Sequence, residues 1–394
     1  MLFSRRQSEY KFNKAYPFLL LLTAAVSFAL QGWRTLFSNF AVHVVKADGF
    51  WIGLIESFRE VPGLLSCIVV YFLYLFREDR LMSHAAFVLG LGVMITGLFP
   101  FKMGLLTATL VMSIGFHFAE TCRQSLVLQC FKIEESAGAF GYIRSVTAIS
   151  NIAVGVLIYL FAYFATMGNT LIIIGVVAML ASLYSYFMKF PLERIGGQRK
   201  RMVVKRKYWL FYLLSFLAGS RRQIFIVFSV LLLVQHYNFS VKGIAIIFIA
   251  SNILNVFMAE RLSRKIDSLG ERKILVFESI IAFSIFMIYA FVDNAYLAAS
   301  LNIVDSVVFS FLIAIKTYLH KIADRPDIAS STAVGFTFNH IAAVIFPLVG
   351  GIMWMYDKRI PFIIGGILSI VSLLCANLIK LPRLQIGKAV FCKT

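Results

Sequence analysis

Twelve long apolar stretches, joined by short polar connections, run through this 394-residue chain. A helix needs about 20 consecutive apolar residues to cross a bilayer. Lipid offers no hydrogen-bond partners, so each stretch has to pair its own backbone groups as a helix. Only 14% of the residues are charged, against about 25% in a soluble domain. We therefore expect an all-α integral membrane protein. Its stretches are 16–44, 50–75, 82–101, 104–130, 137–165, 169–190, 208–236, 241–260, 273–292, 295–320, 328–355 and 361–380.

A basic connection divides the twelve stretches into two sets of six. The predicted organisation is a cytoplasmic segment 1–15, a six-helix bundle 16–190, a basic linker 191–207, a second six-helix bundle 208–380 and a tail 381–394. Two pseudo-symmetric bundles of this kind are typical of duplicated transporter folds.

Weak matches between the halves support a duplication. A shift of 188 residues places Arg34 on Arg222 and Asp79 on Asp267. Further matches occur at shifts of 189 and 190, so the offset is nearly constant across five helices. A fixed internal period of this kind indicates a repeated unit.

The loop charges predict the orientation of the chain. Of the 38 Lys and Arg residues, 26 fall on the side of the termini, five on the opposite side and seven inside stretches. Cytoplasmic loops retain Lys and Arg. We therefore expect a multi-pass protein of the plasma (inner) membrane with both termini cytoplasmic. The positive charge follows the loops and accompanies no basic-aromatic motif, which argues against nucleic acid as a partner.

One cytoplasmic loop carries a recognisable motif. The sequence Ser263-Arg-Lys-Ile-Asp-Ser-Leu-Gly-Glu-Arg-Lys273 resembles the G-x-x-x-D-R-x-G-R-R loop of the major facilitator superfamily, with Ser in place of the first Gly. The counterpart in the first half keeps only Asp79 and Arg80. From the residues themselves, Asp267 is suited to cap the following helix and to pair with Arg272, and Gly270 to form a tight turn. For the copy in the first half, the alternative is a turn whose charges only set the membrane topology.

The resemblance implies a secondary transporter in which this loop latches a cytoplasmic gate. It carries that role to Asp79, Arg80, Asp267, Gly270 and Arg272.

Stretch 104–130 contains ionisable residues at a spacing of three. His117, Glu120 and Arg123 lie along one stripe of the predicted helix. A carboxylate beside an arginine at mid-bilayer can hold or release a proton as access alternates. We expect proton coupling at Glu120 and His117, and at the deep acid Asp305. A static Glu120–Arg123 ion pair is the alternative. In the family this helix often carries an Arg in an R-x-x-Q-G pattern tied to proton transfer, which Arg123-Gln124-Ser125 resembles loosely.

Other deep residues suggest a binding site. In the family, helices 1, 4, 7 and 10 line the cavity, which implies that Arg34, Arg221, Arg222 and Arg123 face the substrate. Guanidinium groups in a low-dielectric cavity suit carboxylate, phosphate or another oxyanion. The alternative is that nearby acids, such as Glu56 or Glu60, neutralise them.

A histidine and a charge sum complete the predicted site. His340 and Asn339 on stretch 328–355 are candidate lining residues, with a purely structural role as the alternative. The deep residues number six basic and four acidic. Arg144 counts among the basic residues, and Glu278 is left out because it lies near a helix end. The excess of two positive charges favours an anionic ligand.

Motifs of other protein classes are absent. The sequence has no G-x-x-x-x-G-K-[ST], H-E-x-x-H or G-x-S-x-G motif and no paired Cys/His set, so we expect no enzyme, cofactor or metal site. The leading hypothesis is a monomeric, proton-coupled secondary transporter of a small anionic solute in the lipid bilayer. The alternatives are a drug or metabolite exporter of the same fold, or a membrane scaffold or sensor that no longer transports.

Overall fold

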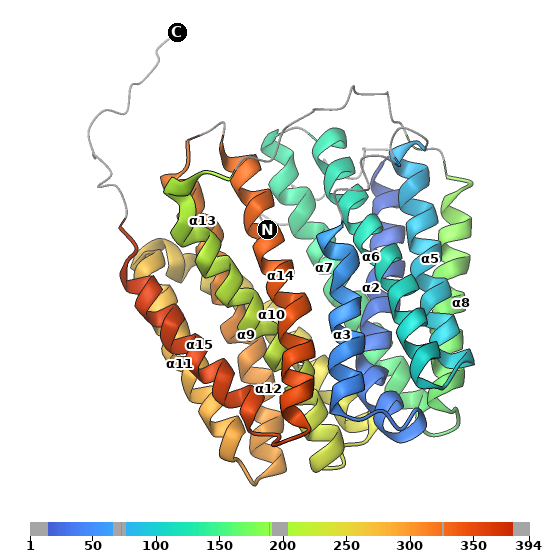
Figure 1. The fold of residues 1–394 in the computed structure, drawn as a ribbon. Coiled ribbons are helices and arrows are strands. Elements are labelled where there is room, and N and C mark those ends of the chain that lie inside the picture. Colours follow the sequence, from blue (N-terminus) through green and yellow to red (C-terminus); the bar gives the residue numbers. More distant parts are fainter. Residues whose placement is uncertain are drawn as a thin grey trace.

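The computed structural model describes residues 15–65, 72, 76–131, 133–188, 190, 204–324 and 327–380. Within these ranges the side chains at 128, 133–138, 259–268 and 329 are not described. The described part is helical and contains no strand. Figure 1 shows the helices running side by side along one direction.

The first half contains six helical spans in the described residues. They are α2 (Tyr16–Asn39) continued by the π-turn η1 (Phe40–Val44), α3 (Gly49–Leu64), α5 (Glu78–Leu98), α6 (Lys102–Cys130), α7 (Ile133–Phe161) and α8 (Met167–Ser185). Polar residues fix several helix starts. The Asp48 side chain accepts a hydrogen bond from the Trp51 amide at 3.0 Å, and Thr166 caps α8 through the Asn169 amide at 3.1 Å.

The second half also contributes six spans. They are η3 (Arg206–Tyr208), α9 (Trp209–Leu231) and the π-turn η4 (Leu232–His236) as one span, then α10 (Val241–Leu269), α11 (Glu271–Phe291), α12 (Ala295–Val308) with η5 (Phe309–Leu312) and α13 (Ile313–Ile322), α14 (Ile328–Trp354) and α15 (Ile360–Asn377). The predicted all-α fold of two six-helix bundles is therefore confirmed.

Eleven of these spans are long and apolar enough to cross a membrane. The exception is α3, which is described over 16 residues and carries Glu56, Arg59 and Glu60. Its charges lower the hydropathy of the helix, and they lie inside the bundle rather than toward lipid.

The internal repeat is present, but the predicted shift of 188–190 residues is wrong by about one helical turn. Gly49 and Val241, which begin α3 and α10, are 192 residues apart, and the starts of α5 and α11, α6 and α12, and α8 and α15 are each 193 apart. The first span of each half ends in a π-turn. Two residues later the backbone has a positive φ, 56° at Lys46 and 54° at Asn238. An error of four residues preserves the helix face, so Arg34 and Arg222 face the same way at different depths.

The predicted cytoplasmic loop at 263–273 is largely helical. Helix α10 continues to Leu269, Gly270 with φ of 80° makes the turn, and α11 begins at Glu271. The N-cap position of α11 is Gly270, and the side chain of Asp267, the expected capping residue, lies outside the described residues. A glycine adopts this left-handed conformation without strain, which allows the reversal to take a single residue.

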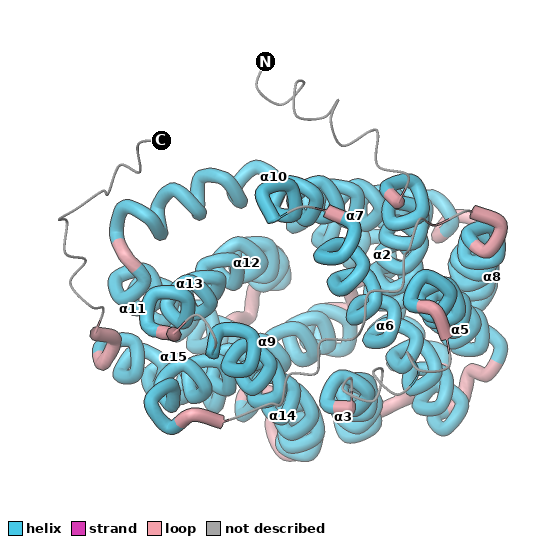
Figure 2. The backbone as a smooth tube through the Cα atoms, turned by 90° about the horizontal axis from the view of Figure 1, so that it is seen from above, coloured by secondary structure: helices cyan, strands magenta, loops and turns pink. Residues whose placement is uncertain are grey.

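The halves meet along two helix pairs, α3 with α14 and α7 with α10, which Figure 2 shows on opposite sides of the bundle. We call the end at which α2 begins the terminal face. At the other end, a Cβ on Gly351 would lie 2.7 Å from the Gly49 carbonyl oxygen and 3.0 Å from the Gly53 Cα. Only glycines allow the two helix backbones to approach so closely. The halves are thus closed at the face opposite the termini.

Ion pairs near the terminal face stay within one half among the described residues. Arg77 pairs with Asp79 in the first half. Lys205 and Lys207 pair with Asp327 in the second half, and Lys321 pairs with Glu271. These pairs therefore do not fasten one half to the other at this end.

The glycine contact generates a prediction about conformation. Gly53→Val places a branched side chain against the α14 backbone and should cost about 1–3 kcal/mol in the closed arrangement. Spin labels at positions 46 and 357, in a cysteine-free background, should then report a longer mean distance between the halves. Gly141→Val is the matched control, because a Cβ there meets nothing within 4 Å. An unchanged distance in Gly53→Val would contradict the role given to this contact.

Candidate functional site

A cavity of about 340 Å³ lies between the two halves, and we call it the central cavity. Helices α2, α3 and α7 line it from the first half, and α9, α10, α12 and η5 from the second. Its lining combines charged groups, amides, hydroxyls and phenyl rings: Gln31, Arg34, Phe37, Ser38, Glu56, Arg59, Asn151, Arg222, Phe225, Ile226, Val227, Ser229, Val230, Phe248, Ser251, Asn252, Asn255, Asn302, Asp305, Ser306 and Phe309. Both halves thus contribute polar groups to one chamber.

Arg34 and Arg222 enter this cavity from opposite halves without an acidic partner. Among the described residues, neither guanidinium has a carboxylate within 4.0 Å, and the buried Nε atom of each lacks a hydrogen-bond partner. The Arg222 Cζ atom lies 4.5 Å from the centroid of the Phe309 ring, an arrangement suited to a cation–π contact. The predicted pairing of Arg34 with Glu56 or Glu60 does not occur.

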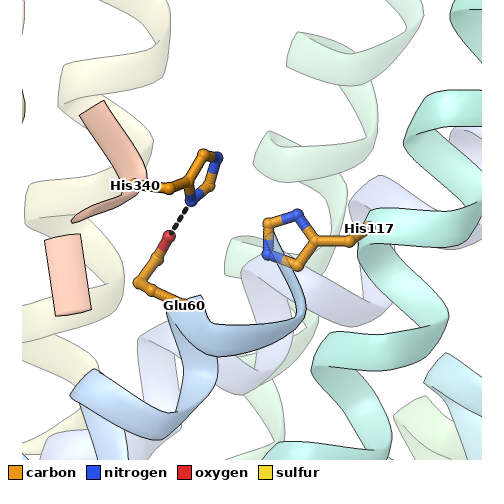
Figure 3. A group of neighbouring side chains, drawn as sticks. All are labelled: Glu60, His117 and His340. Atoms are coloured by element: carbon orange, nitrogen blue, oxygen red, sulfur yellow. Dashed lines mark ion pairs between the residues drawn. The ribbon is translucent and has the colours of Figure 1, made fainter. Parts of the chain in front are cut away.

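Both acids pair with Arg59 instead. Its Nε lies 2.7 Å from Glu56 Oε2 and its Nη2 lies 2.8 Å from Glu60 Oε1. The other oxygen of Glu60 lies 3.1 Å from His340 Nδ1 on α14. Figure 3 shows Glu60 and His340 facing each other, with the His117 ring of α6 beside them. We call Glu56, Arg59, Glu60 and His340 the α3 ion cluster; it crosses between the halves.

Amide and hydroxyl groups form the polar wall of the central cavity. Asn151 of α7 donates to Asn252 of α10 at 3.0 Å, which joins the halves, and Asn302 donates to Ser229 at 2.9 Å. The Ser251 hydroxyl is buried without a partner in the described residues. A solute in the cavity can therefore receive or donate hydrogen bonds at several points.

A second cavity, the side cavity, adjoins the first. It measures about 240 Å³, lies within the first half and shares Gln31, Arg34 and Asn151 with the central cavity. Glu120 and Arg123 line it and form an ion pair, with Arg123 Nη2 2.5 Å from Glu120 Oε1. The two residues face the side cavity as a pair, so both of the alternatives weighed for them from the sequence remain open.

Arg221 and Asn339 do not line either cavity. Arg221 makes a bidentate pair with Glu278 of α11, with both N–O distances at 3.0 Å, and the Glu278 side chain is 3% exposed. Asn339 donates to the Ser215 carbonyl oxygen at 3.2 Å and packs over Gly219. In this conformation Arg221 fastens α9 to α11, and Asn339 fastens α14 to α9.

The predicted charge sum has to be corrected. Glu278 lies two turns inside α11 and is buried, whereas Arg144 is exposed. The inner groups then number five basic residues and five acids, and the predicted excess of two positive charges disappears. The unpaired charges are Arg34, Arg222 and Asp305, since among described residues Asp305 has no ion pair either.

The predicted gate residues form contacts within single halves. Asp79 pairs with Arg77, and Arg80 donates to the Tyr186 carbonyl oxygen at 2.5 Å, which ties α5 to the end of α8. Arg272 donates to Asn377 at 3.3 Å. The Asp267 side chain lies outside the described residues.

Several lining residues were not singled out in the sequence. Asn151, Asn252, Asn255 and Asn302 are asparagines inside apolar stretches, where an amide is costly without a partner. That cost is a usable signal, and with the helix positions it would have pointed to the cavity. Glu60 was considered only as a partner for Arg34.

The fold matches solved transporter structures. No protein-family model matches the sequence, and no curated protein is similar to it in sequence. The crystal structure of the nucleoside transporter NupG, as a D323A mutant, superposes with a TM-score of 0.77 at 14% identity over 92% of this chain and 99% of that one. A bacterial homologue of the human lysosomal transporter Spinster, in an inward-facing and occupied conformation, superposes with a TM-score of 0.74 at 12% identity over 93% and 96%.

Both matched structures are of transporters, and they have the fold of the major facilitator superfamily. This protein therefore has the major facilitator fold and is a multi-pass membrane protein.

The Arg221–Glu278 pair allows a test of its role. Removing one partner leaves a buried charge, so Arg221→Met or Glu278→Leu alone should lower the free energy of unfolding by about 3–5 kcal/mol. The double variant should recover most of the loss in a denaturation experiment, and Arg144→Gln is the exposed control. A double variant that is stable yet has lost transport would instead assign Arg221 to the substrate.

Proposed function

We propose that this protein is a secondary transporter that moves a small anionic solute together with a proton, by alternating access of its two halves to the central cavity. One observation carries the proposal: Arg34 and Arg222 approach one cavity from opposite halves and have no acidic partner among the described residues. A solute held by both arginines would contact both halves at once. Its binding would thus influence how the halves sit relative to one another.

The ligand class follows from the cost of burying charge. A guanidinium in a low-dielectric cavity attracts an oxyanion and offers it paired N–H donors. A volume of about 340 Å³ falls in the range of small-molecule sites. Carboxylates and phosphorylated metabolites of modest size are therefore the favoured substrates.

The charge balance supports coupling to a proton. Arg34, Arg222 and Asp305 sum to one positive charge, and the neighbouring α3 ion cluster sums to one negative charge with His340 neutral. The region is thus neutral without ligand and would become negative with a monoanion. One proton restores neutrality, which lowers the cost of moving the loaded site. Glu120, Asp305 and His117 are the proposed acceptors.

The orientation belongs to the same proposal. With both termini cytoplasmic, as the loop charges predict, the face closed by Gly49, Gly53 and Gly351 is the outer one. The arrangement is then inward-facing in the plasma (inner) membrane, with the chain acting as a monomer. Asp79, Arg80, Asp267, Gly270 and Arg272 would be positioned to form the cytoplasmic gate when the inner face closes.

A neutral polar solute is the second candidate. The local charges sum to zero without a ligand, and four asparagines and four phenylalanines line the cavity. Amides and aromatic faces suit a neutral ring compound with several hydrogen-bonding groups. Of the matched structures, NupG is described as a nucleoside transporter.

The first experiment measures proton flux. Purified protein in proteoliposomes with an internal pH-sensitive dye is offered carboxylates, phosphorylated metabolites, nucleosides and cationic drugs. We expect one anion class to evoke proton entry, and Glu120→Gln to reduce the flux at least tenfold if Glu120 carries the proton. Flux evoked only by nucleosides favours the second candidate. Flux evoked only by lipophilic cations, or no flux with any compound, contradicts the proposal.

The two arginines are tested by matched substitutions. Arg34→Gln and Arg222→Gln each remove one charged donor pair and should lower the transport efficiency by about 10- to 100-fold, equivalent to about 1.5–3 kcal/mol for a charge-assisted hydrogen bond. Arg144→Gln removes an exposed arginine and should leave uptake unchanged. Radiolabelled uptake of the anion found in the flux assay gives the comparison. Equal uptake in all three variants would contradict the arginine assignment.

A further inference from the structure

Three buried side chains from three helices meet where the halves touch. Glu60 comes from α3, His117 from α6 and His340 from α14, so two lie in the first half and one in the second. Each is less than a tenth exposed, and one ligand atom from each lies within 4.8 Å of the other two (Figure 3). Neither the proposed anion site nor the cavity linings include Glu60 or His340.

The three groups are ligands that borderline transition metals prefer. We propose that Glu60, His117 and His340 form a binding site for a divalent transition-metal ion, with Zn²⁺ as the ion of best fit, that fastens the two halves together. Two imidazole nitrogens and one carboxylate oxygen, with an open fourth position, are a common zinc ligand set. The same set also suits Fe²⁺ and Co²⁺.

The spacing of the ligand atoms is close to that of a zinc site. Zinc bonds of about 2.0–2.2 Å in a tetrahedron place neighbouring ligand atoms roughly 3.3 Å apart. Glu60 Oε2 and His340 Nδ1 are 3.1 Å apart, so this edge of the site is already formed. The third ligand, His117, lies within 4.8 Å of the other two ligand atoms, and its ring centroid is 5.3 Å from that of His340, so binding an ion requires its nitrogen to move closer.

The two imidazole rings make few polar contacts for buried groups. His340 Nδ1 is buried and makes no hydrogen bond of acceptable geometry, although it faces the Glu60 carboxylate. Among the described residues, the His117 ring has aromatic neighbours, Phe116 and His340, but no hydrogen-bond partner. A buried polar atom without a partner costs free energy. A metal ion would satisfy both rings at once.

The surroundings give the two rings room and hold the carboxylate. A Cβ on Gly63 would lie 2.5 Å from His340 Nδ1 and 2.7 Å from His117 Cε1, so the rings meet over a residue without a side chain. Arg59 Nη2 binds Glu60 Oε1 at 2.8 Å and leaves Oε2 for the metal. Hydrogen-bonded support of a ligating carboxylate is typical of metal sites.

The charges around the site determine the fourth ligand. Glu56, Arg59 and Glu60 together carry one negative charge, and Arg34 and Arg222 lie in the adjoining cavity. A divalent ion would leave one positive charge, which a hydroxide or another anion in the open position would neutralise. We therefore expect the affinity to increase with pH, because the histidines and the fourth ligand then lose their protons.

The binding test uses purified full-length protein without a histidine tag, with its cysteines replaced by serine and stripped with a chelator. Titration of Zn²⁺ against a chromophoric chelator should show one ion per chain. His117→Ala and His340→Ala should each weaken binding at least tenfold. Co²⁺ should give the visible absorption of a tetrahedral ion in the parent protein and lose it in either variant.

A matched control uses the other histidines of the chain, His43, His84, His236 and His320. Replacing all four by Ala should leave the stoichiometry and affinity unchanged. Gly63→Ala, which keeps every ligand but crowds the rings, should weaken binding. The proposal is overturned if zinc does not bind, or if binding survives in both site variants and disappears in the four-histidine control.

A transport readout rests on the proposed function, whereas the binding test does not. An ion joining α3 and α6 to α14 holds the halves closed, so Zn²⁺ should inhibit solute flux in proteoliposomes and a chelator should restore it. Inhibition should be weaker in Gly63→Ala, which crowds the two histidine rings and leaves the proposed proton acceptor His117 in place. Zinc binding without any solute flux would support the zinc site and contradict the proposed transport function. Solute flux without zinc binding would support the transport function and overturn the zinc site.

Discussion

The cost of placing charge inside an apolar helical bundle governs the arrangement of this protein. Each ionisable group in the interior needs a partner or a function. Arg59 neutralises two glutamates, Arg221 pairs with Glu278, and Arg123 pairs with Glu120. Once these pairs are assigned, Arg34, Arg222 and Asp305 remain without an ion pair in the central cavity among the described residues. Hydrophobic side chains at the two arginine positions would cost less, and we propose that the arginines are present because they bind a ligand.

The contacts between the halves are of two physical kinds. At the face opposite the termini, glycines allow backbones of α3 and α14 to pack directly. Deeper in the bundle, the same helix pair meets through Glu60 and His340, a contact that depends on the charge state of a histidine and on any ion bound there. Packing of the first kind depends on shape alone, whereas the second would respond to protons and to the proposed metal ion. The same interface therefore combines a contact that is insensitive to charge with one that is sensitive to it.

Much of the fold, but less of the site, could be predicted from the sequence. The apolar stretches predicted the spans because length and hydropathy determine what a bilayer accepts. The repeat was recognised with a register error of about one turn, since residues four apart share a helix face. The depth of Glu278 was misjudged because α11 begins two residues earlier than predicted.

Ion pairing was the least predictable feature. Arg59 binds both Glu56 and Glu60. The spacing of Glu56 and Arg59 allows their pair, but it does not decide between Arg59 and Arg34 as the partner of either acid. The grouping of Glu60, His117 and His340 is equally hidden, because the three residues belong to distant helices that form no local motif.

The most direct measurement of the central claim is ligand-dependent thermal stability of the purified protein. A ligand that binds the folded state raises the melting temperature, and the increase grows with the logarithm of the ligand concentration above the dissociation constant. Titration with carboxylates and phosphorylated metabolites should stabilise the wild-type protein with one anion class, and the Arg34→Gln/Arg222→Gln variant should show no such shift. Equal stabilisation of both proteins would contradict the claim that these two arginines hold the substrate.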